Sequence, residues 1–97
     1  MAEQLDAGQL RALAAVVEFG SFDAAAEYLH VTPSAISQRI KALEQRVGQV
    51  LVLREKPCVA TTAGVPLIRL AAQTALLEAE TLAEMRGGSP ERPRVAV

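Results

Sequence analysis

The segment from Thr32 to Gly48 carries the strongest helix signal in the sequence and constrains the fold more than any other feature. Thr32 is a favourable N-cap residue, and Pro33 suits the first helical position because that position needs no amide donor. Gly48 provides a natural stop. Four apolar residues recur between these ends at intervals of four, three and four: Ile36, Ile40, Leu43 and Val47. The sequence therefore predicts an amphipathic helix over residues 33–47 with one buried face.

The opposite face of this helix is polar and free of acids. It carries Ser34, Gln38, Lys41 and Gln45, with Ser37 on its flank. Small or unbranched side chains without negative charge can approach the base edges and phosphates of duplex DNA. The same pattern is also typical of an ordinary solvated helix surface, so the surrounding elements must distinguish the two interpretations.

Two shorter helices are predicted before this one. The first begins at Asp6, which forms a capping-box variant with Gln9, and ends at Gly20, a residue that adopts positive φ at low cost. The second is capped by Ser21 and ends near His30. Their apolar stripes are Leu10, Leu13, Ala14 and Val17 in the first, and Phe22, Ala25, Ala26 and Leu29 in the second. The second of these helices and the helix over 33–47 are joined by a tight turn. Together they predict a helix-turn-helix whose outer helix is 33–47.

A small hairpin with a basic tip is predicted after Gly48. Residues 50–53 are expected to form a strand, 54–57 a turn containing Arg54 and Lys56, and 58–60 a returning strand. The chain as a whole has a net charge of −1. Residues 1–30 carry one arginine and five acids, for −4, whereas residues 31–57 carry five basic residues and two acids, for +3. Because phosphate contact requires local positive potential, the overall charge does not exclude a nucleic-acid partner.

A long fourth helix is predicted from about Ala63 to Met85 or Arg86, capped by Thr61 or Thr62. At ~1.5 Å per residue it would span about 35 Å, which is too long for the small domain to cover. A heptad-like seam runs along it: Ile68, Ala72, Ala75, Ala79 and Leu82. A second stripe comprises Leu67, Leu70, Thr74 and Leu77. One stripe can pack on its own domain and the other needs a partner, so we expect a homodimer or a higher homo-oligomer.

The expected organisation has three parts: a DNA-binding domain over 1–62, a linker and dimerisation helix over 63–86, and a hinge with the first strand of an absent effector-binding domain over 87–97. The strand would be Arg94 to Val97. No apolar run approaches the ~18 residues of a membrane span. No signal peptide is visible, and the single cysteine, Cys58, fits a reducing cytoplasm because it has no internal disulfide partner.

An enzyme is not expected. The serines have no His–Asp partner set, and His30 and Cys58 are each the sole residue of their type. We therefore expect no catalytic residue, no cofactor and no metal site; Cys58 is interpreted as a small buried apolar group, and Phe22 and Tyr28 as core and rim residues. The alternative to DNA binding is a helical dimeric module that binds protein. The two differ in salt dependence, since phosphate contacts release counterions.

Several stretches of the chain resemble the signature of LysR-type transcription regulators. They are Gly20-Ser21-Phe22 with residues 24–29, Val31 to Glu44, then Gly48, Leu51 and Arg54, and residues 61–64. The match covers residues 8 to 86 and implies a mainly α fold: a winged helix-turn-helix with a three-helix core and a small β-hairpin wing, followed by a long dimerising linker helix. Two positions depart from the pattern. Many members carry Phe where Val52 stands and Pro where Thr62 stands.

The resemblance also implies partners and site residues. The outer helix and the wing look most like those of the regulators of lysine and arginine export, whose effector, a basic amino acid, binds a C-terminal domain. Such a regulator would bind double-stranded DNA at a pseudo-palindromic operator. The positions that touch DNA in the family correspond to Ser21, Thr32, Pro33, Ser34, Ser37, Gln38, Lys41, Arg54 and Lys56. Gln38 has the geometry to contact adenine, and Arg54 and Lys56 suit phosphate or a narrow minor groove.

Overall fold

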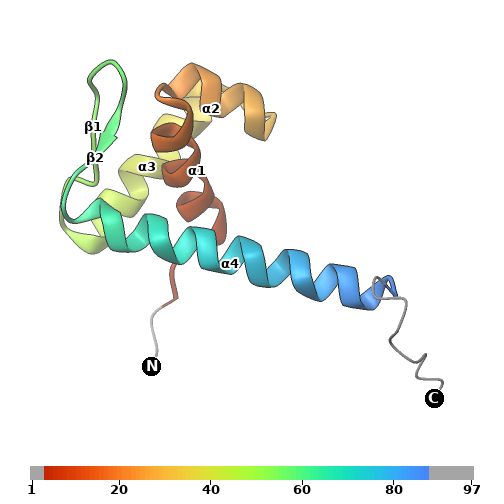
Figure 1. The fold of residues 1–97 in the computed structure, drawn as a ribbon. Helices are drawn as coiled ribbons and strands as arrows, with labels where there is room; N and C mark the ends of the chain where they lie inside the picture. The colour runs from red at the N-terminus through yellow and green to blue at the C-terminus, as the bar shows by residue number, and fades with distance from the viewer. Residues whose placement is uncertain (1–3, 88–97) are drawn as a thin grey trace.

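Three short helices, a two-stranded hairpin and a long helix follow one another in the computed structural model, which describes residues 4–87 (Figure 1). Their bounds are α1 (Ala7–Phe19), α2 (Phe22–Leu29), α3 (Pro33–Val47), β1 (Val52–Leu53), β2 (Val59–Ala60) and α4 (Gly64–Met85). The mainly α winged helix-turn-helix expected from the sequence is confirmed. The expected strand 94–97, and all but the first residue of the expected hinge, lie outside the described residues.

The first three helices are capped as the sequence predicts. Each cap accepts a 3.0 Å hydrogen bond from the backbone N–H three residues further on: Asp6 Oδ1 from Gln9, Ser21 Oγ from Ala24, and Thr32 Oγ1 from Ala35. Each helix ends at a residue with positive φ: Gly20 at 82°, His30 at 61° and Gly48 at 76°. These local signals fix the helix lengths, because both ends find hydrogen-bond partners without help from distant residues.

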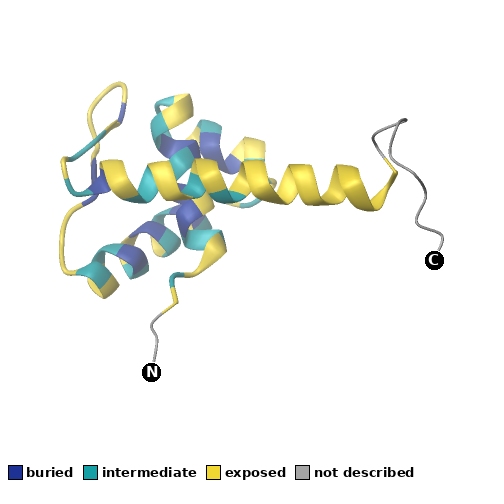
Figure 2. Cartoon of the chain, turned by 60° about the horizontal axis from the view of Figure 1, so that its bottom comes forward, coloured by how far each residue is buried: buried dark blue, intermediate teal, exposed yellow. Residues whose placement is uncertain are grey.

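The core lies where α1, α2, α3 and the base of the hairpin meet (Figure 2). Leu13, Ile36, Ile40, Leu43 and Leu51 are fully buried there. Alanines on α1 and α2 are buried beside them, which lets the short helices approach closely. No polar or charged side chain between residues 4 and 87 is buried. The polar residues of this small domain are therefore at its surface.

The hairpin is shorter than the sequence predicts. Its strands pair at Val52 with Ala60 and at Leu53 with Val59, so the predicted strand starts at residues 50 and 58 are both wrong. Before the paired strands, the Leu51 N–H donates to the Glu44 carboxylate of α3 at 2.8 Å, and only its carbonyl takes a hydrogen bond across the hairpin, from the Thr61 N–H at 3.0 Å. The Leu51 side chain is buried in the core. The wing is thus tied at its base to the end of α3.

α4 begins one residue later than expected, at Gly64, and packs across α1. Thr61, one of two predicted caps, accepts the Gly64 N–H at 3.1 Å and donates to the Val50 carbonyl at 2.7 Å. A side chain at Gly64 would collide with the Leu51 carbonyl oxygen, so glycine permits this close packing. Beyond its first turns α4 projects away from the other helices (Figure 1). Between residues 4 and 87, no helix combines the length and apolarity needed to cross a membrane.

Candidate nucleic-acid interface

The two faces of α3 separate as the sequence predicts. Ile36, Ile40 and Leu43 are fully buried in the core, and Val47 is half-buried. The opposite face is exposed at Ser34, Gln38, Lys41 and Gln45, with Ser37 half-buried on the flank. Burial of the apolar face fixes the rotation of the helix, so its polar side chains face solvent and can meet a ligand. An α-helix presented in this way fits the ~12 Å width of the DNA major groove.

The hydroxyl groups of Ser21 and Thr32 cap α2 and α3. In both caps the oxygen accepts a hydrogen bond from the backbone, and a hydroxyl that accepts still has its own hydrogen to donate. Thr32 is exposed and Ser21 half-buried. Both lie at the positive ends of helices, where anions are favoured. Each cap can therefore donate to a phosphate without giving up its structural role.

The wing leans against the turn between α1 and α2. The guanidinium carbon of Arg54 lies 4.3 Å from the centre of the Phe22 ring. The Cys58 N–H donates to the Gly20 carbonyl at 2.9 Å. Arg54 and Lys56 are both exposed. The structure thus brings Arg54 close to the start of α2. Sequence patterns place Phe22 in the core and do not predict this contact with Arg54.

The nine predicted DNA-contacting residues fall into two groups. Six lie at the start of α3 or on its polar side: Thr32, Pro33, Ser34, Ser37, Gln38 and Lys41. Ser21, Arg54 and Lys56 belong to the α1–α2 turn and the wing. No cluster of three or more His, Cys, Asp or Glu side chains able to hold a metal occurs within residues 4–87. Cys58 is buried, as its interpretation as an apolar core residue requires.

Sequence patterns do not reveal the role of Glu44. Its carboxylate accepts the Leu51 N–H, and its backbone carbonyl accepts from Gly48 and Gln49 at 2.8 and 3.2 Å. These bonds end α3 and set the course of the chain into the wing. Helical periodicity places Glu44 next to the buried Leu43 but says nothing of a partner seven residues away.

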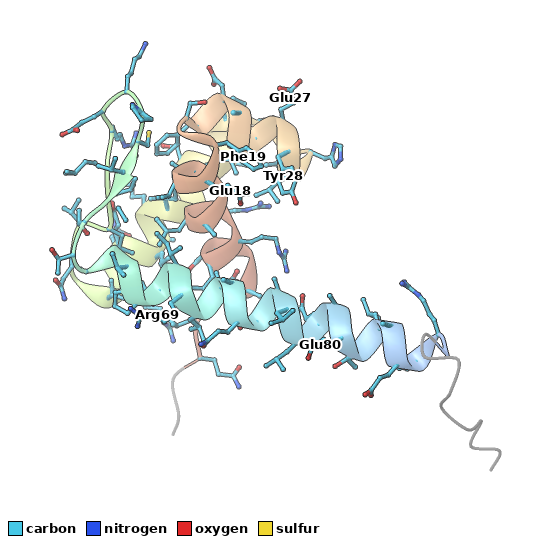
Figure 3. The ribbon with its side chains drawn as sticks, in the orientation of Figure 1. Glu18, Phe19, Glu27, Tyr28, Arg69 and Glu80 are labelled. Atoms are coloured by element: carbon cyan, nitrogen blue, oxygen red, sulfur yellow. The ribbon has the colours of Figure 1, made fainter. Side chains whose placement is uncertain are left out.

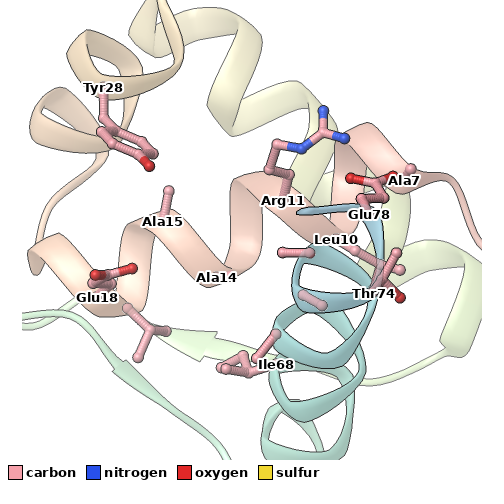
Figure 4. Close-up of a pocket in the computed structure, with 14 residues that line it drawn as sticks. Ala7, Leu10, Arg11, Ala14, Ala15, Glu18, Tyr28, Ile68, Thr74 and Glu78 are labelled. Carbon is pink, nitrogen blue, oxygen red and sulfur yellow. The ribbon is translucent and has the colours of Figure 1, made fainter. Parts of the chain in front are cut away.

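A groove of about 320 Å³ lies between α1 and α4 (Figure 4). Its walls are mainly apolar, and three of the five predicted seam residues line it: Ile68, Ala72 and Ala75. Ile68 also packs on the core, together with Leu67 and Ala71. Own-domain packing therefore takes residues from both predicted stripes in the first half of α4. Further along, Leu82 is 49% exposed, and Ala79 is exposed too.

Comparison with known proteins agrees with this geometry. The sequence model described as "Bacterial regulatory helix-turn-helix protein, lysR family" matches residues 7–65. The Mycobacterium tuberculosis protein named HTH-type transcriptional regulator LysG is 76% identical over 95 residues, which cover 97% of this chain and 31% of that protein. The chain therefore spans about a third of the length of such relatives.

Two further proteins have been solved in informative states. The Corynebacterium glutamicum lysine export transcriptional regulatory protein LysG is 47% identical over 85 residues, covering 88% of this chain and 29% of that protein. Its full-length structure with bound effector Arg has a TM-score of 0.82 at 45% identity, covering 92% and 31%.

The DNA-binding domain of CbnR, solved as a DNA complex, has a TM-score of 0.73 at 30% identity and covers 88% of this chain and 99% of that one. Its length is close to that of the present chain, so the likeness extends over a whole DNA-binding domain. The family match, the relatives and the fold all agree, and this chain belongs to the LysR family of bacterial helix-turn-helix regulators.

Proposed function

We propose that this chain is the DNA-binding part of a dimeric LysR-type regulator that controls the export of a basic amino acid. The observation that carries the proposal is the orientation of α3, whose apolar face is buried while its polar, acid-free face is exposed. The CbnR domain, which has the same fold, was solved bound to DNA. A helix so presented can enter the major groove with its first turns toward the bases.

Within this proposal, base contacts and backbone contacts come from different residues. Gln38 can accept from and donate to adenine at once, and Ser34 and Ser37 can bond to bases or phosphates. Thr32, Pro33 and Lys41 would lie against the backbone at the groove edge, and Ser21, Arg54 and Lys56 against phosphates or the minor groove. Base contacts give sequence specificity, whereas the cationic side chains supply affinity that falls as salt rises.

The proposed homodimer uses α4 and the groove beside it. The seam Ile68, Ala72, Ala75, Ala79 and Leu82 remains its expected contact. The exposure of the seam's outer residues supports this, since Ala79 is exposed and Leu82 is 49% exposed. On other faces of α4, Leu76, Leu77 and Met85 are 59%, 63% and 78% exposed. A monomeric protein rarely leaves so many large apolar side chains in solvent along one helix. Pairing two copies would set two α3 helices against two half-sites of a pseudo-palindromic operator.

The proposed division is a DNA-binding domain over 1–62, a linker helix over 63–86, and a hinge from 87 that leads into an effector domain. The relative named for lysine export, and its structure with bound effector Arg, support lysine or arginine as the effector class. A regulator of this kind acts on the chromosome, in the cytoplasm. No cofactor enters the proposed function.

DNA retention and mobility-shift titrations test the proposal. DNA fragments retained by the protein are sequenced, and the recovered operator is expected to lie beside a gene for a basic amino-acid exporter. Gln38→Ala should then lose about 1–3 kcal/mol of preference for that operator over unrelated DNA. Arg54→Ala should weaken binding to both DNAs and reduce the slope of log affinity against log salt by about one. Gln45→Ala, further along the same exposed face, is the matched control.

A helical module that binds protein is the competing function. It would leave Gln38→Ala and Arg54→Ala indistinguishable from the parent chain on every DNA tested. It would also show no operator footprint and little dependence on salt. That outcome would refute DNA recognition by α3.

A further inference from the structure

Three contacts join the wing to the turn between α1 and α2, and we call them the turn–wing contact. The Cys58 N–H donates to the Gly20 carbonyl, Pro57 lies against Gly20, and the Arg54 guanidinium carbon lies over the Phe22 ring. A Cβ atom at Gly20 would stand 3.0 Å from the Pro57 Cβ, and the residue has a φ of 82°. The wing therefore approaches this turn as closely as a glycine allows.

The cation–π contact of Arg54 with Phe22 constrains a long side chain that is otherwise exposed. A free arginine side chain populates many rotamers, and part of that entropy is lost whenever it binds a phosphate. A guanidinium whose carbon lies over a ring face still has N–H donors available for a phosphate, since it carries five of them. Such an arginine keeps its donors available while part of its ordering cost is already met within the free protein.

Phe22 is held firmly enough to act as this platform. It is the first residue of α2, directly after the Ser21 cap, and its half-buried ring packs against the core. Its position thus depends on the helix-turn-helix rather than on the wing. A change in the orientation of α2 would move the ring, and Arg54 would follow it.

We propose that Phe22 is a positioning residue for DNA binding, which orients the Arg54 guanidinium toward the phosphate backbone. The inference rests on the proposed function, since it assigns Phe22 a role in contact with the same DNA. It differs from a role in the core, because its effect on DNA affinity passes through Arg54. Phe22 itself does not need to touch the nucleic acid.

A double-mutant cycle on the whole chain separates the two roles. Phe22→Leu keeps an apolar side chain in the core and removes the ring, while Arg54→Ala removes the cation. For an exposed cation–π pair of about 0.5–1 kcal/mol, Phe22→Leu should weaken operator binding about two- to fivefold in the parent chain. In the Arg54→Ala background the same change should have almost no effect. Phe22→Tyr retains a ring and should restore the parent affinity.

The salt series and an exchange measurement complete the test. Phe22→Leu should lower the salt slope in the same direction as Arg54→Ala, and faster hydrogen exchange at the Cys58 amide should accompany it. Equal weakening by Phe22→Leu in both backgrounds would overturn the inference in favour of a packing role. If Arg54→Ala binds DNA as the parent chain does while Gln38→Ala loses specificity, the inference fails and the proposed function stands. If all variants and the parent chain show no operator preference, the proposed function itself fails.

Discussion

The helices α3 and α4 are both amphipathic, but the domain buries the apolar face of α3 and leaves much of the apolar surface of α4 exposed. On α3 every residue of the central apolar face, Ile36, Ile40 and Leu43, is fully buried. On α4 only Leu67, Ile68 and Ala71 are half-buried against the core, whereas Leu77 and Leu82 remain 63% and 49% exposed on the outer part of the helix (Figure 2). Figure 3 shows the same projecting segment, with Arg69 nearer the domain and Glu80 far from it. The exposed surface of α3 is polar, whereas that of the outer part of α4 combines polar side chains with large apolar ones.

The two faces suit different kinds of proposed partner. A polar face on a rigid, fully packed helix suits a hydrated, charged ligand, because binding there does not require the helix to move. An apolar face in solvent suits another apolar face, since covering it removes hydrocarbon from water. The first agrees with a DNA contact and the second with a second copy of the chain.

The largest effect is expected from the buried face of α3. Leu43→Ala should lower the free energy of unfolding by about 2–5 kcal/mol, because it opens a cavity in a core that is fully closed around this side chain. Gln45→Ala, two residues along and exposed, should change it by about 0.5 kcal/mol or less. Urea unfolding at one fixed protein concentration measures both, since dimerisation adds to apparent stability. Equal losses would show that the two faces of α3 are not distinct.

The next effect concerns the apolar face of α4. Ala75→Glu places a carboxylate at an exposed alanine that lines the groove beside α1, and burying an unpaired charge in a dimer contact costs several kcal/mol. We expect the dimer dissociation constant to rise at least about a hundredfold, at 1.4 kcal/mol per factor of ten.

Light scattering over a concentration series gives the oligomeric state of this variant. Gln73→Glu adds the same charge at an exposed position that does not line the groove, and should leave the dimer intact. A dimer that persists in Ala75→Glu would remove the groove from the interface.

The parts of this fold that the sequence could predict are those set by local signals. The caps Asp6, Ser21 and Thr32 and the stop at Gly20 each act within a few residues, so composition and spacing revealed them. The polar face of α3 was predictable for the same reason, because helical periodicity is local.

Contacts between distant segments were not predictable. The strand start was misplaced because Leu51 donates to Glu44, and no pattern within the hairpin encodes that bond. Arg54 was singled out for its charge, but its contact with the Phe22 ring joins residues that lie 32 positions apart. Likewise, the position at which α1 crosses α4 decides which α4 residues pack on their own domain. Ile68 therefore both packs against the core and lines the groove.

A smaller effect is expected at the junction of α3 and the wing. Glu44→Ala leaves the Leu51 N–H without its acceptor beside a buried side chain, which should cost about 2 kcal/mol of stability. Glu44→Gln keeps a carbonyl oxygen at the same distance along the side chain and should recover most of that loss. Thermal melts at one protein concentration compare the stabilities of the two variants with that of the parent chain. If Gln fails to recover what Ala loses, the hydrogen bond is not the source of the effect.

The smallest effect tests whether a cap of α3 has a second role. Thr32→Ala and Asp6→Ala each remove a side chain that accepts a 3.0 Å backbone hydrogen bond, so each should lower stability by about 1 kcal/mol. Thr32 begins the helix proposed to enter the DNA groove, whereas Asp6 begins α1. With both variants fully folded in the assay, Thr32→Ala should weaken operator binding and Asp6→Ala should not. Thr32→Ser, which keeps the hydroxyl, should bind as the parent chain does. Equal DNA affinity in all three variants would confine Thr32 to capping and move the backbone contact elsewhere on α3.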